Sequence, residues 1–384
     1  MSALNLGIIG CGFISTRYLR NAPLFKGVAV RAIGDLKAEV ATAQGRTFGV
    51  EAVPVDKLLA RADIDVVVNL TVPNAHYQVS VAALGAGKHV FSEKPLAVDL
   101  AHGKSLNREA ERVKRLLGVA PDTILGPGHR LARKLVDEGR IGRVVAGTAF
   151  VMSRGMEHWH PDPTFFFKPG GGPVLDVGPY YITALVNLIG PVRRVVAMTG
   201  SGLAERLVTA EGPMKGQSIR VETPTTAFAV LEFAQGALVT LNLSWDVFKH
   251  GHRPIELHGT EGSLRAPDPN FFGGQVEYTI GRGDWQILDT RSEPLGLPNY
   301  PDDNPLYANY RMLGVAELAA AAAAGRQNRA SGRLGLHVLD VMQAILAAGA
   351  TGKPVTIEGG ERPEAMSDEE IRALLVDPAS VAAA

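Results

Sequence analysis

Short apolar runs without polar alternation recur along the first 120 residues, with segments of helical character between them. Such runs are typical of parallel strands that are buried on both faces of a sheet. One intervening helix is expected from an N-cap at Asn74 to Gly85, and another over 99–115. The pattern predicts an α/β doubly wound parallel sheet, with strands at residues 6–10, 28–33, 66–70, 89–92 and 116–120.

The pattern changes after Pro121. From Ala237 to Trp245 apolar residues alternate with mostly polar ones, which predicts a strand with one buried face, and residues 234–236 supply a hairpin turn before it. We predict a second, α+β domain whose large, mostly antiparallel open sheet is covered on one side by helices. The predicted division is 1–121, 122–360 and a C-terminal tail over 361–384. Strands are expected at 144–152, 193–199, 226–232, 237–245, 255–259, 275–280 and 285–289, and helices at 128–138, 309–324 and 334–348.

The first strand ends in two glycines, Gly10 and Gly12. A dinucleotide pyrophosphate binds bare backbone amides at a helix N-terminus, so Gly10 is expected to make the turn and Gly12 to let the phosphates approach. Asp35 follows at about the 20-residue spacing of the carboxylate that binds the ribose hydroxyls. That carboxylate favours NAD, while Lys37 leaves NADP open. Ser15 replaces the third glycine of the pattern, and a tight turn in another α/β domain is the alternative interpretation.

The amino-acid composition limits the kinds of molecule that this protein is expected to bind. Acidic and basic residues balance at 39 each, so no basic surface for nucleic acid or anionic lipid is expected. The N-terminus lacks the pattern of a signal peptide and no membrane span is predicted, so a cytoplasmic location is expected. The single cysteine, Cys11, cannot form an intramolecular disulfide. A small-molecule substrate is the expected partner.

The loop after the 89–92 strand reads Glu93-Lys94-Pro95. Ligands of doubly wound sheets bind at the carboxyl ends of the strands, so Lys94 can point at the nicotinamide side of the cofactor. A substrate hydroxyl that loses hydride there must also lose its proton. The alternative for an isolated Glu-Lys-Pro is a surface lysine in a loop.

A second polar pair follows the glycine cluster at residues 170–172. Asp176 and Tyr180 are four residues apart in a segment, 176–188, that is expected to be helical, so they share one helix face. A carboxylate and a phenol at a helix start would face the domain interface. The alternative is that Asp176 caps the helix and Tyr180 packs in the core.

The chain resembles the Gfo/Idh/MocA oxidoreductases in five segments, which are residues 7–12, 71–76, 87–95, 170–180 and 336–342. The resemblance implies an NAD(P)-dependent enzyme in which Lys94 and Asp176 line the site where a sugar hydroxyl faces the nicotinamide. Tyr180 stands where many members have histidine. Tyrosine also occupies this position in relatives similar to glucose–fructose oxidoreductase. The cofactor-binding residues implied are Gly10, Gly12, Phe13, Ile14, Asp35, Thr71, Pro73, Asn74, His76, Glu93 and Lys94.

The chemistry that follows is reversible hydride transfer from a substrate CH–OH group to NAD, with Lys94, Asp176 and Tyr180 as the catalytic residues. Tyr180 is the first choice as proton acceptor, because the Lys94 cation favours an ionised phenol and stabilises a developing alkoxide. In the alternative, Lys94 relays the proton while Tyr180 and Asp176 orient the hydroxyls. Two other functions stay open: a redox-assisted glycosidase and a non-catalytic sugar-sensing regulator.

Substrate contacts are expected from Lys94, Asp176 and Tyr180, and from aromatic and polar residues elsewhere. Trp159 and His160 suit a sugar, whose C–H face stacks on a ring while its hydroxyls seek donors. His129 is a further candidate after the domain crossover. No metal is expected, although the spacing of His158, His160 and Asp162 resembles that of ligands on one side of a strand. The uncovered face of the open sheet predicts a homodimer or homotetramer.

Overall fold

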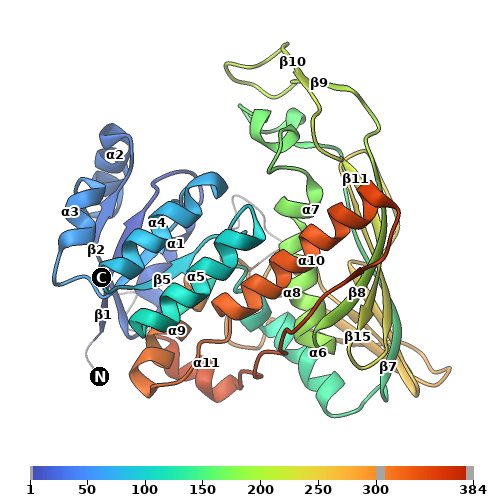
Figure 1. Cartoon of the computed structure of the whole chain (residues 1–384). Helices are drawn as coiled ribbons and strands as arrows, with labels where there is room; N and C mark the ends of the chain where they lie inside the picture. Colours follow the sequence, from blue (N-terminus) through green and yellow to red (C-terminus); the bar gives the residue numbers. More distant parts are fainter. Residues whose placement is uncertain (1–2, 300–307, 378–384) are drawn as a thin grey trace.

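The computed structural model describes residues 3–299 and 308–377. The N-terminal part contains a six-stranded parallel sheet of order β3-β2-β1-β4-β5-β6, which confirms the doubly wound prediction (Figure 1). The strands of this sheet are β1 (Leu4–Ile9), β2 (Val28–Gly34), β3 (Glu51–Ala52), β4 (Val66–Asn69), β5 (His89–Ser92) and β6 (Leu117–Val119). Its helices are α1 (Ser15–Asn21), α2 (Ala38–Phe48), α3 (Val55–Ala60), α4 (Pro73–Gly85) and α5 (Leu100–Val113). Because α4 begins at Pro73, Asn74 lies in its first turn and is not the N-cap.

The second sheet has nine strands in the order β16-β15-β14-β13-β7-β12-β11-β8-β17. Its neighbouring strands are antiparallel except for the parallel pair β12 and β7, so the mostly antiparallel prediction is confirmed. The strands are β7 (Val144–Met152), β8 (Val192–Gly200), β11 (Thr226–Phe233), β12 (Leu238–Ser244), β13 (Ile255–Gly259), β14 (Gly262–Ala266), β15 (Val276–Ile280), β16 (Gln286–Leu288) and β17 (Val355–Thr356). A separate hairpin is formed by β9 (Glu205–Leu207) and β10 (Ser218–Arg220).

Helices cover one face of the second sheet (Figure 1). They are α6 (Pro127–Asp137), α7 (Pro173–Asp176), α8 (Gly178–Ile189) and α10 (Gly332–Thr351). Val239, Leu241 and Leu243 of β12 are fully buried, as the alternation predicts. α10 has the length and hydropathy of a membrane span, but it packs against α5 of the first domain and against α8 and β8 of the second. It therefore forms part of the core that joins the two domains.

The chain returns to the first domain at its C-terminal end. The Ala-rich run lies in α9 (Leu313–Ala324), which packs against β5 and β6. α11 (Asp368–Leu374) begins with a capping box in which Ser367 and Glu370 satisfy each other's backbone amides. The Lys26 amide then donates to the Leu374 carbonyl oxygen, and the Val376 amide donates to the Leu24 carbonyl oxygen. The sequence predicts only a C-terminal tail over 361–384, whereas the structure forms α11 within that range. Residues 378–384 lie outside the described residues.

Candidate active site

The carboxyl ends of β1, β2, β4 and β5 lie side by side and bring the predicted cofactor-binding loops together. Gly10 has a φ of +100°, and its amide donates to the Gly34 carbonyl at 2.9 Å. A Cβ on Gly10 would lie 2.6 Å from the carbonyl oxygen of Leu70. The turn after β1 therefore requires glycine for both conformation and space.

Gly12 is exposed, and a Cβ built on it meets nothing within 4 Å. Packing in the described structure therefore does not require glycine at this position. Beside it, the Asp35 carboxylate accepts hydrogen bonds from the Cys11 amide at 2.7 Å and the Lys37 amide at 2.9 Å. Burial, with a contribution from Asp35, raises the pKa of the Cys11 thiol to about 12, so this cysteine is no nucleophile at neutral pH.

Three apolar side chains around this loop are exposed to an unusual degree. Leu36 is 97% exposed, Phe13 is 80% exposed and Val72 is 66% exposed. They flank the glycine turn, the carboxylate of Asp35 and the loop after β4. An open glycine, the Asp35 carboxylate and uncovered apolar side chains fit a dinucleotide that lies along this edge.

Alanine substitutions at the two glycines are expected to separate folding from cofactor binding. Gly12→Ala should leave the free energy of unfolding within about 0.5 kcal/mol of wild type, since its Cβ meets open space. NAD affinity should fall by tenfold or more, because that Cβ would fill the phosphate approach. Gly10→Ala should instead destabilise the protein by about 1–3 kcal/mol through backbone strain. Chemical denaturation and nucleotide titration measure the two effects, and equal loss of stability in both variants would contradict this assignment.

His76 is predicted to contact the cofactor, and in the structure its ring is buried between two backbone carbonyls. His76 is only 1% exposed, and its ring nitrogens lie 2.7 Å from the Pro95 carbonyl oxygen and 3.0 Å from the Thr71 carbonyl oxygen. Burial lowers the pKa of this ring, although the two carbonyls oppose that shift. His76 is therefore a positioning residue that ties the Glu93-Lys94-Pro95 loop to the loop after β4.

Lys94 and Asp176 meet across the two domains, as the sequence predicts. The Lys94 ammonium donates to the Asp176 carboxylate at 2.7 Å and to the Asp176 carbonyl oxygen at 2.8 Å. Both side chains are at least four-fifths buried. Burial on its own would lower the pKa of Lys94, but the charges of Asp176 and Tyr180 outweigh it and raise the pKa. Lys94 is thus a cation at neutral pH with one N–H left for a substrate.

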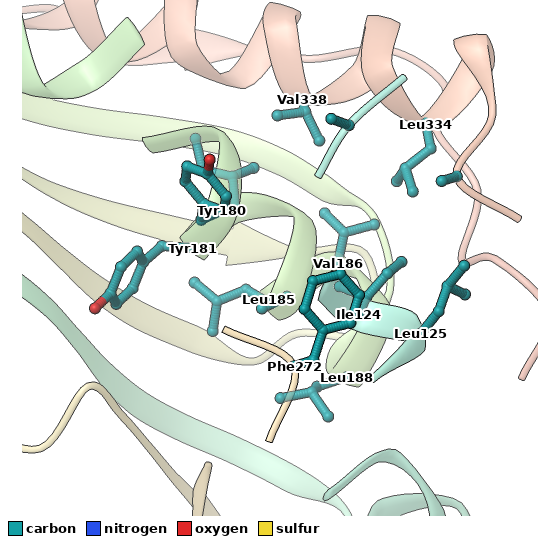
Figure 2. Packing of buried hydrophobic residues seen from close by; sticks show 14 of the residues in the cluster. Ile124, Leu125, Tyr180, Tyr181, Leu185, Val186, Leu188, Phe272, Leu334 and Val338 are labelled. Carbon is teal, nitrogen blue, oxygen red and sulfur yellow. The ribbon is translucent and has the colours of Figure 1, made fainter. Parts of the chain in front are cut away.

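Tyr180 joins this pair from a different helix than expected. The predicted single helix breaks at Val177, so Asp176 is the last residue of α7 and Tyr180 lies in the first turn of α8. The Lys94 ammonium lies 5.4 Å from the centroid of the Tyr180 ring, which is 7% exposed. Figure 2 shows Tyr180 at the edge of the apolar cluster, its hydroxyl pointing away from Leu185 and Phe272.

Sequence reasoning missed Arg311, which precedes α9. Its Nη2 donates to the Tyr180 hydroxyl at 3.1 Å and to the Asn270 side-chain oxygen at 2.9 Å. Burial would lower the pKa of Arg311, but the charges of Tyr180 and Glu93 raise it. Arg311 stands in an irregular stretch with no motif around it, so no sequence signal marked it.

Of the predicted substrate residues, Trp159 is 55% exposed and packs edge-on against His160, with ring centroids 5.3 Å apart. Their loop is held by a buried ion pair between Glu157 and Arg206 of β9. His129 is fully buried, and burial lowers its pKa to about 4, so its contact with a substrate stays a prediction that the described surface does not support. Among the described residues, no group of three His, Cys, Asp or Glu side chains could hold a metal ion.

Comparisons with known proteins identify the family to which the two parts of the chain belong. A sequence model described as the oxidoreductase family, NAD-binding Rossmann fold, matches residues 4–120. A second, described as the GFO/IDH/MocA C-terminal domain, matches residues 129–265. The two matches together cover well over half of the chain and fall on its two domains.

Individual relatives are similar over most of their length. A 1,5-anhydro-D-fructose reductase of Ensifer adhaerens is 26% identical over 361 residues, which is 92% of this chain and 98% of that protein. A levoglucosan dehydrogenase of Pseudarthrobacter phenanthrenivorans is 28% identical over 292 residues, which is 69% of this chain and 73% of that protein. A solved structure of levoglucosan dehydrogenase in complex with NADH has the same fold, with a TM-score of 0.80 at 22% identity over 93% of this chain and 100% of that one.

Proposed function

Because this chain belongs to the Gfo/Idh/MocA oxidoreductase family, we propose that it is an NAD-dependent dehydrogenase of a sugar or polyol. The observation that carries the proposal is the Lys94 ammonium, fixed by Asp176 beside the Tyr180 phenol at the cofactor edge of the first sheet. A cation and a titratable hydroxyl side by side suit a substrate hydroxyl that must lose a proton. The Asp35 carboxylate favours NAD over a 2′-phosphorylated nucleotide.

Bound NAD would supply the acceptor for the hydride that leaves the substrate carbon. The chain's own residues handle the remaining proton and charge. Lys94 donates a hydrogen bond to the substrate oxygen and stabilises its developing negative charge. The phenolate oxygen of Tyr180 accepts the hydroxyl proton as the C–H bond breaks and the carbonyl forms. Asp176 holds the ammonium in place and keeps it charged.

The proposal of a carbohydrate substrate rests on the loop that carries Trp159 and His160, and on the names of the similar proteins. An exposed indole beside an imidazole offers a stacking surface and a polar partner, which suits a carbohydrate. The relatives named above are a 1,5-anhydro-D-fructose reductase and a levoglucosan dehydrogenase. Product analysis tests the proposal: one NADH should form for each carbonyl product. A glycosidase that uses NAD only transiently would release sugar without net NADH.

We further propose that the open face of the second sheet forms a homodimer or homotetramer interface. Met198 is 80% exposed, Phe228 is 49% exposed, and the two are paired across β8 and β11. Val196 and Val230 form the next pair and are 45% and 41% exposed. Such a contiguous apolar patch favours self-association.

The cytoplasmic location stays a prediction from the sequence.

Light scattering tests the interface. Wild type at micromolar concentration is expected to give a mass of two or four chains, and Phe228→Glu should shift it towards one chain because it places a charge in the patch. Phe248→Glu is a matched control, since Phe248 is 83% exposed but lies outside the paired strands. A monomeric wild type, or equal dissociation in both variants, would count against this interface.

A further inference from the structure

Arg311 is a buried cation with hydrogen-bond partners in four parts of the chain. Its guanidinium donates to Tyr180 in α8 and to Asn270 in the loop after β14, while Nη1 donates to Asn309 at 2.9 Å. The Arg311 carbonyl oxygen accepts a hydrogen bond from Asn21 at the end of α1. Only 7% of the residue is exposed. The side chain is therefore fixed in one orientation, with an N–H directed at the Tyr180 oxygen.

Two cations lie near the phenol of Tyr180. The Lys94 ammonium lies 5.4 Å from its ring centroid, and the Arg311 guanidinium lies 5.8 Å from the same centroid. Lys94 is already bound to Asp176. Arg311 thus supplies the direct hydrogen bond to the Tyr180 oxygen, and this bond is stronger when that oxygen is negative.

The carboxylates nearby have other donors. Glu93 accepts from the Tyr18 hydroxyl at 2.8 Å and from the Lys94 amide at 3.2 Å. Asp122 accepts from the Gly314 amide at 2.8 Å. Burial raises the pKa of the Asp122 carboxyl to about 6. Burial and the negative charge of Glu93 together raise the pKa of the Tyr18 hydroxyl. The titratable and charged groups around Tyr180 and Arg311 are Lys94, Asp176, Glu93, Asp122 and Tyr18. Asp268 lies in the same loop as Asn270 and accepts a hydrogen bond from the Tyr181 hydroxyl.

We propose that Arg311 is a positioning residue that fixes the Tyr180 oxygen and stabilises its phenolate form, and so tunes the proton acceptor of the reaction. The inference rests on the proposed function, because it assigns Arg311 a role in that proton transfer. The other N–H groups of Arg311 that the structure pairs donate to Asn270 and Asn309, so its hydrogen bond to Tyr180 is the one that reaches the proposed proton acceptor. Its effect on turnover therefore passes through Tyr180.

The test compares Arg311→Met, Arg311→Lys, Tyr180→Phe and the Arg311→Met, Tyr180→Phe double variant. Arg311→Met is expected to lower kcat at neutral pH by tenfold or more, and to move the rising limb of the kcat profile to higher pH by about one unit. Arg311→Lys keeps a charge and should show a smaller shift. In the Tyr180→Phe background, Arg311→Met should lower kcat no further. NAD affinity should change little in every variant.

A spectroscopic readout makes the inference independent of turnover. Alkaline titration of the phenolate absorbance in wild type minus Tyr180→Phe isolates one tyrosine, and that signal should appear at higher pH when Arg311→Met is present. If wild type turns over no substrate, the proposed function fails, yet this titration still tests Arg311. Unchanged kcat profiles and unchanged titrations in Arg311→Met, or full additivity in the double variant, would overturn the assignment. Arg311→Lys carries the same test if Arg311→Met does not fold.

Discussion

Replacement of Lys94 by methionine is expected to lower kcat/KM for polyol oxidation by about 10³-fold. Methionine keeps most of the length of the side chain but removes the ammonium that would stabilise the substrate alkoxide. The glycine turn and Asp35 are untouched, so NAD affinity should change by less than about tenfold. Initial rates with a saturating nucleotide and titration of NAD into the variant measure the two quantities.

Asp176→Asn is the matched control for Lys94, since it keeps the ammonium and removes its carboxylate partner. The Asp176 charge raises the pKa of Lys94, so its loss lowers that pKa. Activity at neutral pH should then fall less than in Lys94→Met, and the decline on the alkaline side should begin at lower pH than in wild type. Lys94→Met with near-normal turnover would contradict the role given to the ammonium.

Tyr180→Phe is expected to lower kcat by about 10²–10³-fold and to remove the rising limb of the pH profile of kcat. Phenylalanine fills the same space in the α8 core, so the free energy of unfolding should stay within about 1 kcal/mol of wild type. The only group removed is the hydroxyl that Arg311 contacts. The full pH profile, with denaturation as the stability control, checks both statements.

This variant also separates the two proton acceptors that the sequence leaves open. An unchanged pH profile in Tyr180→Phe, together with loss of turnover in Lys94→Met, would identify Lys94 as the acceptor. The structure favours Tyr180, because Lys94 is ion-paired and its raised pKa keeps it protonated. A charged ammonium donates hydrogen bonds and cannot take up a further proton.

The fold could be predicted where the periodicity was strong. Buried runs such as β4 and the alternation of β12 follow directly from the sequence, and so does the hairpin turn before β12. The parallel pairing of β12 with β7 could not be predicted, since pairing depends on contacts between distant segments. The docking of α11 on the first domain has the same cause.

The candidate site was predictable where it depends on motifs. Lys94 and Asp176 were placed together by a loop tripeptide and a glycine cluster, and the structure pairs them. Burial was the quantity that the sequence could not supply: His76 and His129 carry the right chemistry, but packing closes both rings to solvent. Arg311 was missed for the converse reason, because only the tertiary fold brings it to Tyr180.

The measurement that tests the account most directly is absorbance at the NADH band while the purified protein and NAD meet a panel of sugars, inositols and anhydrosugars. The account predicts that the signal grows with NAD and at least one polyol or sugar, that it is weaker with NADP, and that it is lost in Lys94→Met. A flat trace across the panel, with NAD bound to the protein, would contradict the dehydrogenase assignment and leave the glycosidase and sensor alternatives.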